Sequence, residues 1–175
     1  MLVVFKILFL LAIFALSTMI GIIISKKYSN RVNELQETIT ALEILESRIN
    51  YTYDTIPEIF DFIARHLKTN VRNIFEYTAE KLNIDKNFSA GELFNSTIDE
   101  EKILLDLNDE DIEALRGLAV SLGQVDLESQ LKNIRLIIKT LMSQLEVAKK
   151  EKDKNFKLCR NMGVMVGVLL IIILI

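Results

Sequence analysis

The chain has 175 residues, of which 50% are hydrophobic and 26% are charged, and its formal net charge is −3. The single cysteine, Cys159, excludes an internal disulfide framework, and with His66 as the only histidine the usual zinc ligand sets are excluded too. Because the hydrophobic residues concentrate at both ends, we expect one small domain flanked by membrane segments rather than a simply soluble protein.

The first predicted element is a membrane-spanning helix at residues 1–27. Residues 7–24 carry no charge and end at a lysine pair, which fits a spanning helix of about twenty residues. A cleaved signal peptide is the competing interpretation, because Lys6 precedes the apolar run and Ala15-Leu16-Ser17 weakly resembles a cleavage site. The run continues well past this tripeptide, as in an uncleaved anchor, so we expect it to remain in the membrane.

An all-α cytoplasmic bundle is predicted at residues 28–160. Apolar residues recur at helical spacing, and no run alternates with the two-residue period of a half-buried strand. The first helix of the bundle continues from the anchor, and we expect Glu34, Glu37, Glu43 and Arg48 on its solvent side.

Capping residues mark the later helix starts. A threonine or serine followed three residues later by glutamate forms a capping box, and acids at a helix start are favoured by the macrodipole. The predicted starts are Thr55 with Glu58, Asn70, Ser89 with Glu92, and Asn108 with the acids at 109–111, and Gly123 is placed to end the last of these helices.

One long helix is predicted from Asp126 to the C-terminus. Its apolar stripe over 127–148 most simply packs antiparallel to the stripe over 32–49. Residues 161–175 form a short membrane-embedded helix that carries no charge. Its fourteen residues from Met162 span only about 21 Å against a hydrocarbon core of about 30 Å, so full crossing does not follow from the sequence.

Charge is unevenly distributed and predicts the topology. Residues 54–128 contain 17 acids and 7 bases, whereas residues 131–160 contain 3 acids and 9 bases. Bases next to both membrane segments favour a cytoplasmic location for the bundle and contact with lipid headgroups. No aromatic platform accompanies them, so no nucleic-acid partner is expected. These bases are Lys26, Lys27, Arg31, Lys149, Lys150, Lys154, Lys157 and Arg160.

Small residues recur at every fourth position in both membrane segments. This spacing lets helices approach closely in lipid, although glycine is also common there by chance. Ser17, Gly21 and Ser25 lie in the first segment, and Gly163 and Gly167 lie in the second. We therefore hypothesise an intramolecular helical hairpin.

The sequence offers no catalytic, cofactor-binding or metal-binding residues. None of the six glycines forms a phosphate-binding loop, and His66 lacks a nucleophile or acid at a recognisable spacing. The acids at 109–111 are interpreted as helix caps rather than as a cation site. Cys159 lies at the membrane boundary and is a candidate for acylation, although a lone thiol there is usually inert. We expect a protein that is not an enzyme.

The stretch Leu122-Gly123-Gln124-Val125-Asp126-Leu127-Glu128-Ser129-Gln130, followed by a long helix and a glycine-bearing apolar tail, resembles the stage III sporulation protein AB family. Gly123, Asp126 and Gln130 carry this motif. An N-terminal anchor followed by Arg31 and a leucine-rich helix also matches. Arg48 stands where the family has a glutamate, and the resemblance extends along nearly the whole chain.

The resemblance implies a role in the mother-cell export or feeding apparatus of endospore-forming bacteria, in the membrane around the forespore. It also implies a cytoplasmic domain like that of inner-membrane platform proteins of type II secretion and type IV pilus machines. The expected partners are a cytoplasmic secretion-type ATPase, other membrane components of the apparatus and the lipid bilayer, and homo-oligomerisation is left open. The alternative is a general membrane-tethered scaffold or signalling hairpin unrelated to sporulation.

Overall fold

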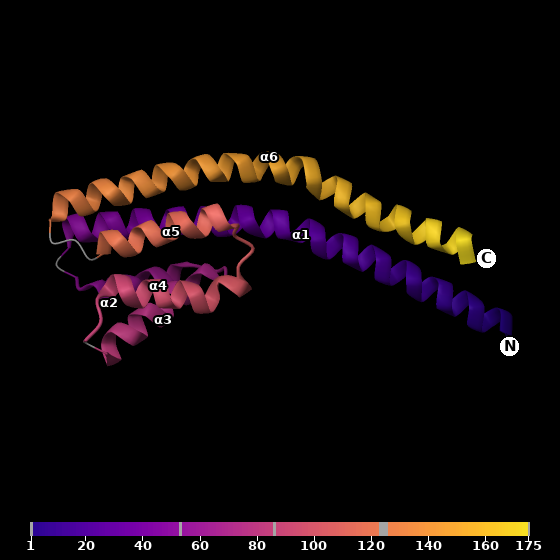
Figure 1. Cartoon of the computed structure of the whole chain (residues 1–175), viewed down its shortest axis with the longest axis horizontal. Coiled ribbons are helices and arrows are strands. Elements are labelled where there is room, and N and C mark those ends of the chain that lie inside the picture. The colour runs from indigo at the N-terminus through magenta and orange to yellow at the C-terminus, as the bar shows by residue number, and fades with distance from the viewer. Residues whose placement is uncertain (1, 53, 86, 123–125, 175) are drawn as a thin grey trace. The chain divides into compact units, whose positions relative to one another are not determined.

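The computed structural model describes residues 2–52, 54–85, 87–122 and 126–174, and every regular element in these ranges is helical. The all-α prediction is therefore confirmed. The helices are α1 (Leu2–Tyr51), α2 (Ile56–His66), α3 (Val71–Ile84), α4 (Ala90–Glu101), the 3₁₀ turn η1 (Lys102–Leu104), α5 (Asp109–Leu122) and α6 (Leu127–Leu174), as shown in Figure 1.

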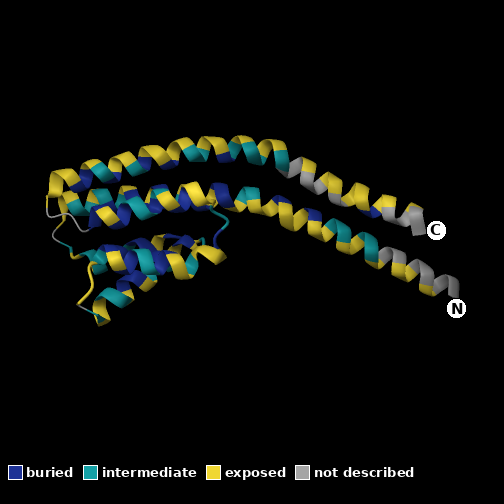
Figure 2. Ribbon diagram, in the orientation of Figure 1, coloured by how far each residue is buried: buried dark blue, intermediate teal, exposed yellow. Residues whose placement is uncertain are grey.

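The chain forms two compact units. The terminal unit comprises Met1–Asn30 and Ala148–Ile175, and the central unit comprises Arg31–Val147. In the central unit, α1 and α6 run side by side (Figure 1), as their matching apolar stripes predict. Arg135 of α6 donates to the Glu46 carboxylate of α1, with 2.5 Å between Nε and Oε1. Figure 2 shows exposed residues along the outer side of α6.

The core between α1 and α6 consists of aliphatic side chains at helical spacing. Leu35 and Leu42 of α1 and Ile134 and Leu141 of α6 have no exposed surface. These residues belong to the two stripes that the sequence predicts, so the antiparallel pairing follows from the burial of one apolar face on each helix.

Three phenylalanines hold α2, α3 and α4 together. Phe60, Phe75 and Phe94 come from the three helices in turn, and none has exposed surface. The centroid of the Phe60 ring lies 5.3 Å from that of Phe75 and 5.7 Å from that of Phe94, and Phe75 and Phe94 are also 5.7 Å apart. Each ring thus packs against both others at distances typical of favourable aromatic pairs.

Both predicted capping boxes are present. Ser89 Oγ accepts from the Glu92 backbone N–H at 3.2 Å, and the Glu92 carboxylate accepts from the Ser89 N–H at 2.8 Å. At the start of α2, the Glu58 carboxylate accepts from the N–H and hydroxyl of Thr55 at 2.7 and 2.8 Å. The hydrogen bonds with the threonine and serine lower the pKa of each glutamate.

Two local expectations differ from the structure. Asn70 precedes α3 but makes no side-chain cap, and its Nδ2 instead donates to the Leu104 carbonyl at 2.7 Å. Glu34 was expected on the solvent side, whereas only 3% of its surface is exposed. The predicted helix end at Gly123 lies outside the described residues, although α5 does extend to Leu122.

The terminal unit brings the first part of α1 against the last part of α6. A Cβ atom at position 167 would lie 2.9 Å from Cδ2 of Phe14 and 3.4 Å from Cβ of Ser17, so α1 and α6 touch at this glycine. Gly21 and Ser25 are buried, and Ser25 Oγ donates to the Ile22 carbonyl at 2.8 Å. The packing surface of Gly163 lies outside the described side chains.

Among the described residues, one helix has the length and apolar composition needed to cross a membrane, and it lies within Ala12–Tyr51 of α1. This agrees with the predicted N-terminal anchor. The membrane-embedded character of residues 161–175 stays a prediction.

Gly91 of α4 is expected to tolerate no larger residue. A Cβ atom there would lie 2.2 Å from the backbone oxygen of Ala119, so Gly91→Ala must push α4 and α5 apart, with a destabilisation of about 1–3 kcal/mol. The matched control is Gly117→Ala, whose Cβ would meet only Ile137 side-chain atoms at 3.5 Å and whose helix propensity would rise by up to about 1 kcal/mol. Thermal unfolding of the detergent-solubilised chains, followed by circular dichroism, should rank Gly117→Ala above wild type and Gly91→Ala below it.

Gly167→Leu is expected to separate the helices of the terminal unit. Positions 21 and 163 lie one helical step of four residues from the Ser17–Gly167 approach, so cysteines placed there should crosslink in a Cys159→Ser background. The leucine side chain would clash with Phe14 and Ser17 and reduce that crosslink. An unchanged crosslinking yield would contradict the hairpin.

Candidate functional site

Three charged residues on α1 each hold a different segment of the central unit. Arg31, Glu34 and Glu37 follow one another at three-residue spacing, which places them along one side of the helix. We call these three residues the polar clamp. Their partners lie in the α2–α3 connection, in the η1–α5 connection and at the start of α5.

Arg31 forms a buried ion pair with Asp111. Arg31 Nε lies 2.8 Å from Asp111 Oδ2, and Nη2 lies 3.2 Å from Oδ1, so the contact is bidentate. The Asp111 side chain has no exposed surface. Its carboxylate also accepts from the Asn108 N–H at 3.0 Å, while Asn108 Oδ1 accepts from the Asp111 N–H at 2.9 Å. The predicted cap at Asn108 is thus present, and it is joined to α1 by a charge-assisted contact.

Glu34 holds the connection between η1 and α5. Its Oε2 accepts from the Asp106 N–H at 2.7 Å. Burial raises the pKa of the Glu34 carboxyl to about 7, against the lowering effect of the backbone hydrogen bonds from Asp106 and Leu107. The nearby Asp106 and Glu37 carboxylates raise it further.

Glu37 holds the connection between α2 and α3. Its carboxylate accepts from the Lys68 N–H at 2.9 Å, and from the Thr69 N–H and hydroxyl at 2.7 and 2.8 Å. Backbone N–H groups ahead of a helix need acceptors, and a carboxylate meets that need especially well. Glu37 thus supplies from α1 a carboxylate acceptor just ahead of α3, where the Asn70 side chain makes no cap.

The clamp fixes α2–α5 to α1 by directed contacts. The prediction that Glu34 faces solvent was wrong. Helical periodicity alone places a charged residue on the outer side, and it cannot detect a partner that lies 72 residues away. One signal was available: Glu34 lies at helical spacing from Ala41 and Leu45, which are both buried, so it sits at the edge of the apolar stripe.

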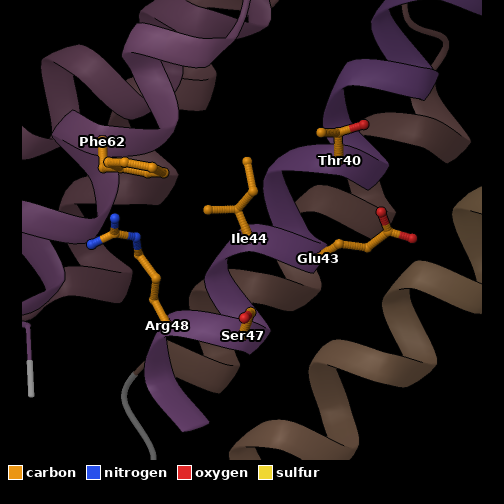
Figure 3. A pocket seen from close by; sticks show the side chains of 6 residues that line it. All are labelled: Thr40, Glu43, Ile44, Ser47, Arg48 and Phe62. Atoms are coloured by element: carbon orange, nitrogen blue, oxygen red, sulfur yellow. The ribbon is translucent and has the colours of Figure 1, made fainter. Parts of the chain in front are cut away.

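A shallow groove of about 350 Å³ lies between α1 and α2 (Figure 3). It is lined by Thr40, Glu43, Ile44, Ser47 and Arg48 of α1 and Phe62 of α2. Figure 3 shows Arg48 lying against the Phe62 ring, and its guanidinium carbon is 3.5 Å from the ring centroid. Arg48 also pairs with Asp54. The lining of the groove thus combines two apolar, two hydroxyl-bearing and two charged side chains.

The residues predicted for lipid headgroups divide into three groups. Lys26, Lys27, Lys150 and Lys154 are exposed, and Lys149 is half-buried. Arg31 is the exception, because Asp111 satisfies its charge inside the central unit. The side chains of Lys157 and Arg160 lie outside the described set, as does that of Cys159, the candidate for acylation. Within the described residues, no three His, Cys, Asp or Glu side chains gather as a metal site would require.

The family-motif residues lie at the start of α6. Asp126 Oδ2 accepts from the Ser129 N–H at 3.0 Å, and the hydrogen bonds from Ser129 lower the pKa of Asp126. Asp126 is therefore the N-cap of the long helix. Gln130, one turn later, is 9% exposed, and Gly123 lies outside the described residues.

Glu34→Gln is expected to change how stability depends on pH. The folded-state pKa of about 7 lies above the ordinary 4.5, so between these values the folded chain binds more protons than the unfolded chain. The protonated Glu34 carboxyl therefore contributes to the stability of the folded wild type. This contribution is fully present below pH 4.5 and is lost as the pH rises through 7. Glutamine keeps the acceptor for the Asp106 N–H but does not titrate. The free energy of unfolding of Glu34→Gln, relative to that of wild type, should therefore increase with pH by up to about 3 kcal/mol.

The measurement is the unfolding midpoint of the detergent-solubilised full chain at several pH values from 5 to 8. Thr38→Val is the control, because Thr38 lies one turn further along α1 and its hydroxyl donates to the Glu34 carbonyl without titrating. Its difference from wild type should not change with pH. A Glu34→Gln difference that is equally constant would show that this carboxyl does not titrate in the range.

Comparison with known proteins identifies the family. A family model described as stage III sporulation protein AB matches residues 6–175. Stage III sporulation protein AB of Bacillus subtilis (strain 168) is 27% identical to this chain, over 90% of this chain and 92% of the relative. A solved structure of a stage III sporulation protein AB superposes with a TM-score of 0.69 at 23% identity, covering 71% of this chain and 98% of that one, and so supports the fold. The chain, with its capped long helix and α1-centred bundle, belongs to the stage III sporulation protein AB family.

Proposed function

We propose that this chain is a non-enzymatic platform component of the mother-cell-to-forespore secretion or feeding apparatus. Membership of the family implies a role in sporulation, and the candidate membrane helix in α1 suggests membrane association. In this proposal the chain sits in the mother-cell membrane around the forespore. Its central unit faces the cytoplasm and docks a secretion-type ATPase, alongside other membrane components of the apparatus.

The polar clamp is the observation that carries the platform proposal. A platform must hold its cytoplasmic part rigidly to its membrane helix. Arg31, Glu34 and Glu37 tie the start of α5 and two connections of the central unit to the same helix that contains the candidate membrane span. A load applied to α2–α5 would therefore reach α1 through contacts whose directions are fixed.

The acidic surface of α3–α5 supports a docking role. Residues 71–122 contain twelve acidic and five basic residues. Many of the acids are exposed, and they include Glu80, Glu92, Asp99, Glu100, Asp109, Glu110 and Glu113. A surface of one predominant sign steers a partner of opposite sign and fixes its orientation. We infer that the ATPase presents a basic surface to these helices.

The test is co-purification of the detergent-solubilised full chain with the secretion-type ATPase of the same apparatus. Glu110→Lys combined with Glu113→Lys reverses two exposed charges on α5, and it should weaken capture and its dependence on salt. Lys132→Glu combined with Lys139→Glu on the exposed side of α6 is the matched control and should leave capture unchanged.

Failure of the well-folded wild-type chain to capture the ATPase would contradict the docking proposal and leave the family assignment untouched. Equal capture by wild type and both variants would remove the acidic surface from the proposal.

A further inference from the structure

The 3₁₀ turn η1 presents two neighbouring aliphatic side chains to solvent. Ile103 is 83% exposed and Leu104 is 56% exposed, whereas the next residue, Leu105, is only 8% exposed. Single exposed aliphatic residues are common on proteins and need no explanation. Here two adjacent aliphatic residues, Ile103 and Leu104, are exposed at the tip of a connection, and the next residue, Leu105, reaches the core. We call Ile103 and Leu104 the apolar tip.

The apolar tip is held in place on both sides. The Leu104 carbonyl accepts from Asn70 Nδ2 at 2.7 Å, and the Asp106 N–H donates to Glu34 at 2.7 Å. Asn73 Nδ2 donates to the Glu101 carboxylate at 2.9 Å just before the turn. These contacts come from α1, from α3 and from Asn70 just before α3, so the exposure of the tip belongs to a fixed backbone and not to a loose loop.

The clamp places the apolar tip near the end of the central unit where the chain passes toward the candidate membrane span. Asp106 is bonded to Glu34, which lies only seven residues after Lys27. Even a fully extended chain of seven residues spans at most about 25 Å, and a helical one spans about 10 Å. The polar interface on each side of the hydrocarbon core is several ångströms deep. The tip is therefore tethered within reach of the membrane surface.

We propose that the apolar tip, Ile103 with Leu104, inserts into the headgroup region of the leaflet from which α1 emerges. The proposal rests on the membrane location of α1 and not on the docking of an ATPase. A fixed backbone that carries two exposed aliphatic side chains loses little conformational entropy on insertion, and burial of the two side chains drives it.

The charges beside the tip select the kind of lipid surface. Lys102 is exposed, and its Nζ lies 2.9 Å from the Asp99 carboxylate. Glu100 is exposed too, and Glu101 is half-buried. A strongly anionic surface would repel these acids, so the chemistry fits zwitterionic headgroups, with Lys102 able to reach a phosphate.

A second exposed apolar pair provides the comparison site. Ile84 is 85% exposed and Phe88 is 53% exposed, and both line a shallow groove between α3 and α4. Ile84 lies at the opposite end of α3 from Asn70, so about 20 Å of helix separates it from the residue that holds the tip. The two positions match in exposure and differ in their distance from the clamp.

The sequence contains no tryptophan, so a single introduced tryptophan reports its own surroundings. Ile103→Trp and Leu104→Trp are the test variants, Ile84→Trp is the exposed control and Ile20→Trp is the control within the candidate span. Each full-length chain is reconstituted into phosphatidylcholine vesicles with or without brominated acyl chains, which quench nearby tryptophan. We expect strong quenching at position 20, intermediate quenching with a blue-shifted emission at 103 or 104, and none at 84.

The proposal would be overturned if the tryptophan at position 20 is quenched while those at 103 and 104 behave like the one at 84. That result would leave the membrane anchor intact. Absence of quenching at position 20 would overturn the membrane location itself, and the proposal with it. Because the tip residues are exposed, substitution should not disturb folding, and matching circular dichroism spectra would verify this.

Discussion

The buried ion pair between Arg31 and Asp111 is the contact on which the arrangement of the central unit depends. Two charges removed from water are tolerated only when their geometry is good and their remaining hydrogen-bonding capacity is used. Asp111 meets both conditions, since it receives two guanidinium contacts and the Asn108 N–H. Loss of Arg31 would leave the Asp111 carboxylate buried without its guanidinium partner. The start of α5 therefore has one favourable position against α1, and the Glu34–Asp106 contact beside it follows from that position.

Apolar burial and polar contacts contribute different things to this bundle. The Phe60, Phe75 and Phe94 cluster and the α1–α6 stripes bury apolar surface, and the hydrophobic effect that favours this burial has no preferred direction. The clamp adds direction, because each carboxylate must meet particular N–H groups. Close backbone approach adds a further constraint at Gly91, whose lack of a side chain lets α4 meet the Ala119 carbonyl. Gly91 is therefore needed for the packing of α4 on α5, although it belongs to no phosphate-binding motif.

The helices and most of their starts could be predicted from the sequence because they depend on neighbours. The Ser89–Glu92 box and the acid-rich start of α5 use residues within three positions of one another, and the apolar stripes of α1 and α6 use a fixed period. The clamp could not be predicted, because Arg31 meets Asp111 across 80 residues and Glu37 meets Thr69 across 32. A basic residue that follows an apolar run can also have either of two roles. Lys26 and Lys27 are exposed, as a topology signal requires, whereas Arg31 is part of the core.

The position of the clamp along α1 matters for a platform. Among the 50 residues of α1, those that hold the start of α5 and the two connections lie at positions 31–37, and the covalent connection to α2 leaves only after Tyr51. Near the far end of α1, the Arg48–Asp54 pair is another place where a displacement of α2–α5 would reach α1 through a directed contact. Through the clamp, the displacement enters α1 within ten residues of Lys27. The charge-assisted contacts of the clamp thus supplement the apolar packing of the central unit and fix the direction of α2–α5 relative to the part of α1 that carries the clamp.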